Sequence, residues 1–396
     1  MSDIPAREAK VFMQAGRRMP VTLVRGQGTR VWDAEGKAYL DFVAGIASTS
    51  LGHADEGLAD AVSRQMRTLH HVSNLFYTEP QVQLAELLVK HSAFDRVYFQ
   101  NSGAEANEAA FKLARKWGQQ HRNGAYEIIS ANNSFHGRTL MTVSATGTPR
   151  YRDPFGPSIP GFHFVDYDNV EAIKAATTTS TVAILLEAVQ GEGGVNVPAP
   201  DYLKQVRAWC DAQGLLLILD EVQTGVGRLG TLWAYQQTGI EPDIMTLAKG
   251  LAGGVPIGAV LAKEQAAVFE PGDHGSTFGG NPMSTAAGLH VLTRVAEGGV
   301  LANVNERGDQ LERALLSLED RFPVVKGVRG KGLLRGLELK QEIAPDVVTA
   351  AIERGLLANA VRPDVVRLMP PLNVTADEIA EAVAIIEQAL AAVTSK

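Results

Sequence analysis

Cysteine and long apolar runs are scarce in this sequence. Cys210 is the single cysteine among 396 residues, so no disulfide can form within the chain, which fits a reducing compartment. Its neighbours have amphipathic helical spacing, so we expect Cys210 to be a small core residue. No apolar run approaches the length of a membrane span, and the N-terminus lacks the apolar run of a signal peptide. These absences predict a cytoplasmic protein without a membrane partner.

Positive charge is also in short supply. The 37 Lys and Arg residues are outnumbered by 44 Asp and Glu residues, which gives a formal charge of -7. A net negative chain argues against nucleic acid as the main partner. Hydrophobic residues make up 45% and charged residues 20%, as in globular proteins. The length exceeds that of one ordinary core, so two or more domains are expected.

Strand-like and helical patterns alternate through most of the chain. Residues 29–33 and 37–42 predict a hairpin. Helical patterns then cover 56–72, 80–92, 103–120 and 201–213, and strand-like runs cover 96–100, 126–130, 163–167, 182–189 and 215–221. The last run, LLLILDE, is continuously apolar, which is typical of a strand buried on both faces. The alternation predicts an α/β fold with a mostly parallel sheet covered by helices.

The pattern changes after Pro282. Long amphipathic helical patterns at 283–296, 301–321 and 376–393 alternate with short strands around 324–338 and 365–368. We therefore expect a large domain over 56–282 and a smaller α+β domain over 283–396, which the N-terminal segment 1–55 joins. The segment 43–53 is too apolar for a plain surface loop, and we expect it to line a pocket or a subunit contact.

Lys249 lies at the centre of the stretch 243–258, DIMTLAKGLAGGVPIG. The apolar residues 244–248 predict a short buried strand that ends at the lysine. Glycines and Pro256 follow, so we expect a chain that continues neither as a helix nor as a central strand. Burial lowers the pKa of a lysine and yields a neutral amine that attacks carbonyl groups. An isolated lysine is more often a strand-end residue that reaches solvent.

Three further clusters carry chemistry. Asp220 and Glu221 follow the most apolar strand, at the end where ligands bind in open α/β sheets; the alternative is a helix cap or salt bridge. Ser102 and Glu105 have capping-box spacing, and the same helix start offers N–H groups to a phosphate. The third cluster is formed by residues 135–138, in which Phe135 could be a core residue.

Arg138, in the third cluster, and a glycine-rich motif each have two interpretations. Arg138 is either a surface charge or a bidentate carboxylate reader. Residues 225–230, GVGRLG, match the dinucleotide fingerprint G-x-G-x-x-G. We discount the match, because the glycines do not follow the strand directly and an acidic pair would repel a pyrophosphate. Pyridoxal 5'-phosphate requires a lysine, an aspartate, a phosphate-binding helix start and an aromatic ring, and this sequence contains all four.

Seven segments carry a resemblance to a known family. NSGAEANEA, SFHGRT, QGEGGV, LLLILDEVQTGVGR, DIMTLAKGL, GGVPIGA and STFGGNP occur in this order. They are similar to the class III, fold-type I, pyridoxal-phosphate aminotransferases, and most of all to the acetylornithine aminotransferases, over nearly the whole chain. The resemblance implies a homodimer with shared active sites and no metal. One departure is Ala188, where relatives usually have proline; it affects a turn.

The family implies a role for each matching residue. Lys249 resembles the Schiff-base lysine that also shuttles the proton, and Asp220 the partner of the pyridine nitrogen. The remaining cofactor contacts would come from Gln223 near the ring hydroxyl, Phe135 and Val222 on the two ring faces, Ser102, Gly103 and Ala104 at the phosphate, and Thr277 at the phosphate of the neighbouring subunit. Substrate contacts would come from Arg138 and Arg367 to carboxylates, Glu192 beside Arg367, and Ile46 and Ser276.

The resemblance implies transfer of the δ-amino group of N2-acetylornithine to 2-oxoglutarate. The products would be N-acetylglutamate 5-semialdehyde and glutamate, a step of arginine biosynthesis. Ile46 stands where ornithine δ-aminotransferases carry tyrosine, which argues against free ornithine. Succinylornithine, succinyl-diaminopimelate and 4-aminobutyrate remain alternative substrates. An isomerase or decarboxylase on the same fold and a non-catalytic binding protein are the rivals from other classes.

Overall fold

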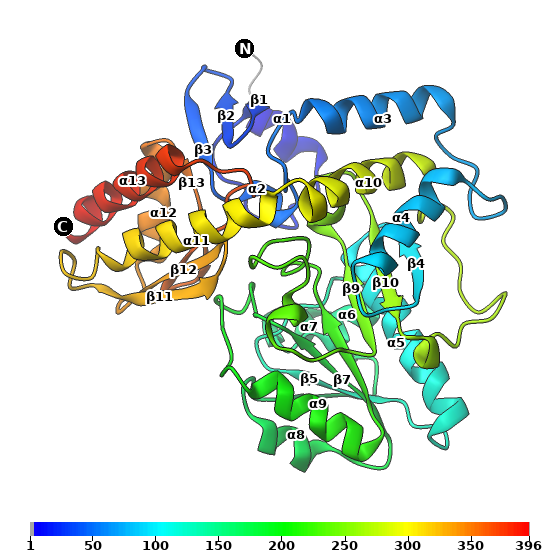
Figure 1. Ribbon diagram of the computed structural model, residues 1–396. Helices are drawn as coiled ribbons and strands as arrows, with labels where there is room; N and C mark the ends of the chain where they lie inside the picture. The colour runs from blue at the N-terminus through cyan, green and yellow to red at the C-terminus, as the bar shows by residue number, and fades with distance from the viewer. Residues whose placement is uncertain (1–3, 396) are drawn as a thin grey trace.

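The computed structural model describes residues 4–395, arranged around three sheets (Figure 1). The largest sheet has seven strands in the order β4-β10-β9-β8-β7-β5-β6. Their bounds are β4 (Arg96–Gln100), β5 (Glu127–Ala131), β6 (Phe162–Val165), β7 (Thr181–Glu187), β8 (Leu216–Asp220), β9 (Ile244–Leu247) and β10 (Gly258–Ala262). Strands β9, β8, β7, β5 and β6 pair in parallel, whereas β10 is antiparallel to both β9 and β4. The predicted mostly parallel α/β sheet is confirmed.

Strand β8 is buried on both faces, as its unbroken apolar sequence predicts. Leu217 and Leu219 belong to one core cluster together with Val206 of α9 (Tyr202–Gln213). Ile218 points the other way, into a second cluster with Phe111 of α5 (Gly103–His121). Because successive side chains of a strand alternate between faces, the helices α5 and α9 cover opposite faces of the sheet. Cys210 of α9 is fully buried, and burial raises the pKa of its thiol to about 12, as suits a core residue.

Further helices surround the large sheet. Helix α10 (Pro282–Glu297) packs on α3 (Glu56–Thr68) and α4 (Glu79–Lys90) along one side (Figure 1). The remaining elements of this part are short: α6 (Leu140–Ala145), α7 (Pro149–Arg152), α8 (Val170–Ala176), η1 (Asp153–Phe155), η2 (Ala234–Gln237), η3 (Lys249–Ala252) and η4 (Glu264–Ala266). No helix within residues 4–395 has both the length and the apolar character needed to cross a bilayer.

Two four-stranded sheets complete the fold. One has the order β1-β2-β3-β13 and the other β11-β12-β15-β14. Their strands are β1 (Leu23–Gln27), β2 (Arg30–Asp33), β3 (Ala38–Asp41), β11 (Val325–Lys331), β12 (Leu334–Leu339), β13 (Leu356–Leu357), β14 (Asn359–Arg362) and β15 (Val365–Leu368). The predicted hairpin is the antiparallel pair β2 and β3, and β3 also pairs in parallel with β13. The N-terminal and C-terminal parts of the chain therefore share one sheet.

The helices of the C-terminal part are α11 (Val300–Leu316), α12 (Ala344–Glu353) and α13 (Ala376–Thr394), and the N-terminal helix is α1 (Ile4–Val11). Helix α12 is absent from the sequence prediction, although its buried residues Val347, Val348, Ala351 and Ile352 have helical spacing. Helix α11 ends five residues before the predicted residue 321. The prediction that the chain after Lys249 forms neither helix nor central strand is wrong, since η3 begins at Lys249 and Gly258 opens the buried strand β10.

Glu221 follows β8 and stabilises the fold. Its side chain is 1% exposed, and its two oxygens accept hydrogen bonds from the N–H groups of Ala234 (2.7 Å) and Tyr235 (2.8 Å) at the start of η2. For this residue the helix-cap alternative is therefore confirmed. Burial raises the pKa of Glu221 to about 7, even though both N–H groups favour its charged form.

Replacing Glu221 by glutamine tests this burial through pH. The folded chain binds the Glu221 proton more tightly than the unfolded chain, where the ordinary pKa is 4.5. The contribution of this group to the free energy of unfolding is therefore fully present below pH 4.5 and is lost as the pH rises to about 7. Urea unfolding between pH 4.5 and 8 should show this loss in the parent protein and in the control Glu342→Gln, an exposed glutamate, but not in Glu221→Gln. Parallel pH profiles in all three proteins would contradict the assignment.

Candidate active site

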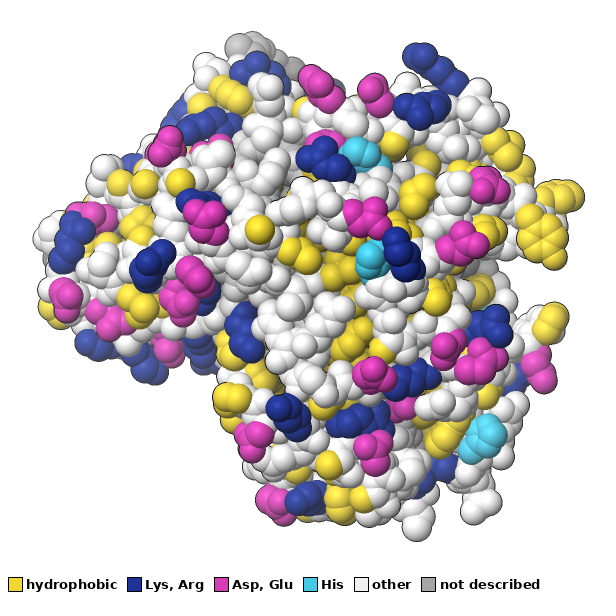
Figure 2. All heavy atoms as spheres, viewed as in Figure 1, with side chains coloured by type: hydrophobic (Ala, Val, Ile, Leu, Met, Phe, Trp, Pro, Cys, Tyr) yellow, Lys and Arg dark blue, Asp and Glu magenta, His cyan; other side chains and the backbone are white. Residues whose placement is uncertain are grey.

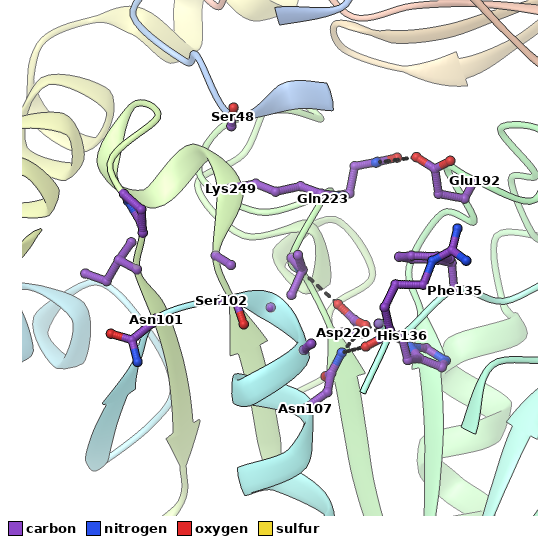
Figure 3. Close-up of a pocket in the computed structure, with 18 of the residues that line it drawn as sticks. Ser48, Asn101, Ser102, Asn107, Phe135, His136, Glu192, Asp220, Gln223 and Lys249 are labelled. Atoms are coloured by element: carbon purple, nitrogen blue, oxygen red, sulfur yellow. Dashed lines mark hydrogen bonds and ion pairs between the residues drawn. The ribbon is translucent and has the colours of Figure 1, made fainter. Parts of the chain in front are cut away.

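A cavity of about 370 Å³ lies at the carboxyl ends of β7, β8 and β9 (Figure 3). This is the edge at which open α/β sheets bind ligands. Ten of the residues predicted for the site line it: Ser102, Gly103, Ala104, Phe135, Arg138, Glu192, Asp220, Val222, Gln223 and Lys249. They come from segments far apart in the sequence, and Ser48 of the apolar segment 43–53 also lines the cavity.

Asp220 is the last residue of β8 and is held by three donors. Its Oδ2 accepts hydrogen bonds from Asn107 Nδ2 (2.8 Å) and His136 Nδ1 (2.7 Å), and its Oδ1 accepts one from the Val222 N–H (3.0 Å). Since a carboxylate can only accept, the His136 proton lies on Nδ1. Asp220 is only 4% exposed, so these contacts fix both the position and the direction of a buried carboxylate.

Glu187 lies beside Asp220 because the two residues are register partners on β7 and β8. Burial, followed by the neighbouring charge of Asp220, raises the pKa of Glu187 well above its ordinary value. Its Oε2 accepts a hydrogen bond from the Phe135 N–H (3.3 Å). Glu187 therefore holds its proton more tightly than an ordinary glutamate does beside the carboxylate of Asp220.

Lys249 follows β9 with an unusual backbone. Its φ of 43° lies in the left-handed region, where the backbone of any residue other than glycine is strained. The next residue is anchored, because Ser50 Oγ donates a hydrogen bond to the carbonyl of Gly250 (2.9 Å). Burial lowers the pKa of Lys249, and the nearby Arg367 acts in the same direction. No hydrogen bond or ion pair involves its Nζ within residues 4–395, so the cavity holds an amine that is free to react.

The first turn of α5 faces the same cavity. Ser102 Oγ accepts the Glu105 N–H (3.2 Å), and Glu105 Oε2 accepts the Asn101 N–H (2.8 Å), which is a helix cap as predicted. The N–H groups of Gly103 and Ala104 are among those that a helix leaves without internal partners. A side chain at Gly103 would lie 2.7 Å from Val222 Cγ1, so packing against Val222, and not only access for a phosphate, requires the glycine.

Arg367 of β15 reaches this edge from the small sheet. Its side chain is 0% exposed, and its Nη1 forms an ion pair with Glu192 Oε1 (2.7 Å) and donates to Gln223 Oε1 (3.3 Å). Gln223 Nε2 also donates to Glu192 (3.1 Å), as the dashed line in Figure 3 shows. Burial alone would raise the pKa of Glu192, but Arg367 and Lys249 outweigh it and lower the pKa. Arg367 Nη2 is buried without a partner among the described residues.

Besides Arg367, which reaches the edge only through Glu192 and Gln223, three predicted residues do not line the cavity. Ile46 is 45% exposed and lies in the left-handed turn α2 (Ala44–Ala47). Ser276 Oγ accepts hydrogen bonds from Asn101 Nδ2 (3.2 Å) and the Gly279 N–H (3.0 Å), so it adjoins the cavity wall. Thr277 is exposed. One chain alone does not bring Ile46 and Thr277 to the site.

The structure adds residues for which no role was predicted. Asn107 and His136 bind Asp220, and Glu187 lies beside it. Signals for two of them were present: His136 stands inside the segment SFHGRT, and Asn107 is a polar residue on the buried face of a helix. Glu187 ends a predicted strand, and its pairing with Asp220 depends on strand order, which the sequence does not give.

These residues fit pyridoxal 5'-phosphate. An amine of lowered pKa, a firmly held carboxylate and open N–H groups at a helix start surround one cavity. They match the carbonyl, the ring nitrogen and the phosphate of that cofactor in charge and donor type. The half-buried Phe135 adds an aromatic ring to the wall.

Known proteins resemble this chain over almost its full length. The family described as Aminotransferase class-III matches residues 11–390. An acetylornithine aminotransferase from Caldanaerobacter subterraneus subsp. tengcongensis is 51% identical over 384 residues, which cover 97% of this chain and 98% of the relative. The structure of the Toxoplasma gondii ornithine aminotransferase, described with partial occupancy of PLP at its active site, has a TM-score of 0.95 at 36% identity and covers 98% and 94% of the two chains. The N-acetylornithine aminotransferase structure from Stenotrophomonas maltophilia has a TM-score of 0.85 at 38% identity and covers 98% and 99%.

Asn107 offers a test of how the site is built. Besides its bond to Asp220, it donates to the carbonyl of His136 (2.8 Å) and accepts from Thr246 Oγ1 (2.8 Å). Asn107→Ala should lower the free energy of unfolding by about 1–3 kcal/mol, because buried polar partners lose their bonds. Thr246→Val, which removes one of these bonds, should cost less. Denaturant unfolding measures both, and an Asn107→Ala protein as stable as the parent would show that the network does not hold Asp220.

Proposed function

Because the chain belongs to the class-III aminotransferase family, we propose that it moves the terminal δ-amino group of N2-acetylornithine to 2-oxoglutarate. The products are N-acetylglutamate 5-semialdehyde and glutamate, a step of arginine biosynthesis. The observation that carries the proposal is the ion pair of Arg367 and Glu192 beside the reactive Lys249, because this site must accept two unlike substrates. Relatives named acetylornithine aminotransferase, such as one from Thermosynechococcus vestitus at 53% identity, support the choice of substrate.

The enzyme is a fold-type I aminotransferase that depends on pyridoxal 5'-phosphate. When bound, this group takes up an amino group from one substrate, passes it to the next, and withdraws electrons from the reacting carbon. We propose that the large domain, residues 56–282, holds it. Ser102 and the N–H groups of Gly103 and Ala104 would receive the phosphate. Asp220 would face the ring nitrogen, Gln223 the ring hydroxyl, and Phe135 and Val222 the two ring faces.

Lys249 has two proposed tasks. In its neutral form the amine would hold the cofactor carbonyl, and Nζ would also take a proton from the reacting carbon and return it to the neighbouring atom. Its lowered pKa suits both tasks, because a protonated amine can neither attack nor accept. The three donors on Asp220 keep its carboxylate in place to hold a proton on the ring nitrogen.

Arg367 and Glu192 would let one site serve both substrates. Glutamate has a carboxylate on its reacting carbon, whereas acetylornithine has a hydrogen there and keeps its carboxylate at the far end. An unpaired buried arginine is costly, so Glu192 would hold Arg367 while acetylornithine reacts and release it to glutamate or 2-oxoglutarate. The structure has the paired arrangement, with Arg367 Nη2 still available as a donor. Arg138 would bind the distal carboxylate of both substrates.

A homodimer with shared sites would place the residues that one chain leaves outside. Thr277 would reach the phosphate in the partner's site, and Ser276 and Ile46 would lie near the substrate. Large apolar side chains stand exposed at Leu75 (81%), Phe76 (67%) and Tyr77 (100%), in the loop between α3 and α4. Figure 2 shows apolar side chains projecting at this edge of the molecule. Such a patch suits burial against a second subunit.

The alternative functions differ in the amino donor or in the product. Isoleucine at position 46 argues against ornithine, whose free α-amino group needs a polar partner. Succinylornithine, succinyl-diaminopimelate and 4-aminobutyrate would require a different fit at the mouth of the cavity. An isomerase or decarboxylase would not need a keto acid to restore the cofactor. We infer that the enzyme works in the cytoplasm, because its single cysteine fits a reducing compartment.

A panel of amino donors tests the proposed function. The enzyme loaded with pyridoxal phosphate is mixed with acetylornithine, ornithine, succinylornithine, succinyl-diaminopimelate or 4-aminobutyrate, and the single-turnover change in its absorbance is followed. Acetylornithine should give the largest ratio of rate to dissociation constant, and 2-oxoglutarate should restore the starting spectrum. A higher ratio for another donor would replace the proposed substrate. Restoration without a keto acid would contradict transamination.

Substitutions at Glu192 and Arg367 test the switch. Glu192→Ala should slow the half-reaction of acetylornithine and leave or improve that of glutamate, because Arg367 is then always free. Arg367→Ala should damage the glutamate half-reaction most, by about 2–5 kcal/mol for a desolvated charge pair. Single-turnover rates for each half-reaction decide the matter. Equal losses in both halves for Glu192→Ala would leave Glu192 as ordinary support for the site.

A further inference from the structure

Tyr151, in the short helix α7, belongs to a stack of side chains at the edge of the cavity. Its ring meets the Phe135 ring edge-on, with centroids 5.6 Å apart and an interplanar angle of 86°. The guanidinium carbon of Arg138 lies 3.9 Å from the Tyr151 centroid and 5.3 Å from the Phe135 centroid. The distance to Tyr151 is that of direct stacking, so Tyr151 is the main surface on which Arg138 rests.

The backbones on both sides of this contact are fixed. Thr139, next to Arg138, starts α6 with a capping box that it shares with Thr142. Tyr151 donates its N–H to the carbonyl of Thr148 (3.1 Å), and Thr148 Oγ1 donates to the carbonyl of Ser134 (3.1 Å), beside Phe135. The short helix is thereby tied to the loop that carries Phe135 and Arg138. The conformation of the Arg138 side chain is what remains to be set.

Apart from the more distant Phe135 ring, no other described residue restrains it. Arg138 is exposed, and no hydrogen bond or ion pair to its guanidinium is present within residues 4–395. A free arginine side chain has many rotamers, and ordering it on substrate binding costs conformational entropy. Stacking on a ring restrains the guanidinium plane and leaves its N–H edges open to a carboxylate.

We propose that Tyr151 is a positioning residue that presents Arg138 to the distal carboxylate of the substrate. The inference rests on the proposed function, in which Arg138 binds that carboxylate. Because the distal carboxylate stays bound while the other end of the substrate reacts, a misdirected Arg138 weakens ground state and transition state alike. The loss therefore falls on KM and leaves kcat almost unchanged.

The hydroxyl group of Tyr151 can be tested separately from its ring. Arg150 donates a hydrogen bond to Tyr151 Oη (2.9 Å), and its guanidinium lies 4.8 Å from the ring centroid. Tyr151→Phe removes this bond but keeps the ring beneath Arg138. Tyr151→Leu and Tyr151→Met remove the ring. A matched control is Phe164→Leu. The guanidinium carbon of Arg152, in the same short helix, lies 4.6 Å from the centroid of the Phe164 ring, and Phe164 does not line the cavity.

The experiment follows the glutamate half-reaction of the holoenzyme in single turnovers, in which KM stands for the glutamate concentration at half the limiting rate and kcat for that limiting rate. Tyr151→Leu and Tyr151→Met should raise the KM for glutamate by roughly two- to thirty-fold, the range that corresponds to a lost cation–π contact, with kcat nearly unchanged. Tyr151→Phe and Phe164→Leu should keep the parent KM. In a double-mutant cycle, Tyr151→Leu should add no further loss to Arg138→Leu, because both act through the same guanidinium.

Four results would overturn the inference. They are a parent-like KM in both ringless variants, a loss in Tyr151→Phe equal to that in Tyr151→Leu, a fall in kcat without a change in KM, and additive losses in the double mutant. A parent-like KM in Arg138→Leu would overturn the proposed role of Arg138 and this inference with it. Failure of the parent enzyme to accept acetylornithine would overturn the proposed substrate alone, because the cycle uses glutamate.

Discussion

The site depends on keeping a carboxylate, Asp220, in the dry end of a sheet that is covered on both faces. A buried carboxylate is tolerated only when donors surround it, and α5 and the loop after β5 supply them through Asn107 and His136. Burial and the charge of Asp220 raise the pKa of the neighbouring Glu187, which disfavours a second charge there. The strained backbone of Lys249 then places an amine with a lowered pKa in the same cavity. The positions of α5 and of the loop after β5 thus matter to the site through their hydrogen bonds to one buried carboxylate.

Two arginines would read carboxylates in this site, and their settings differ. Arg367 is fully buried, so its charge needs a partner at all times, and Glu192 with Gln223 provides one. Arg138 is exposed and needs no counter-charge, but it needs a direction, which the Tyr151 ring can supply. The buried arginine can therefore act as a switch between substrates, while the exposed one holds the part that both substrates share. Burial, more than residue type, separates the two roles.

Much of the fold follows from local patterns in the sequence. The apolar run before Asp220 predicts a strand buried on both faces, and the spacing of Ser102 and Glu105 predicts the start of α5. The strand at Gly258 escapes prediction, because it forms by pairing with β4 and β9 and follows a glycine-rich stretch. The same holds within the site: Lys249 and Asp220 stand out, whereas Glu187 acquires its raised pKa only through pairing of β7 with β8. Ile46 and Thr277 lie outside the cavity of one chain, and the role predicted for Thr277 is in the site of a partner subunit.

The central claim is that Lys249 is the amine that binds the cofactor. Borohydride reduction of the holoenzyme followed by peptide mapping tests it most directly, because reduction fixes pyridoxal phosphate to the residue that holds it. We expect one labelled peptide, which contains Lys249, and no label in Lys249→Ala. A label on any other lysine of the parent protein would contradict it.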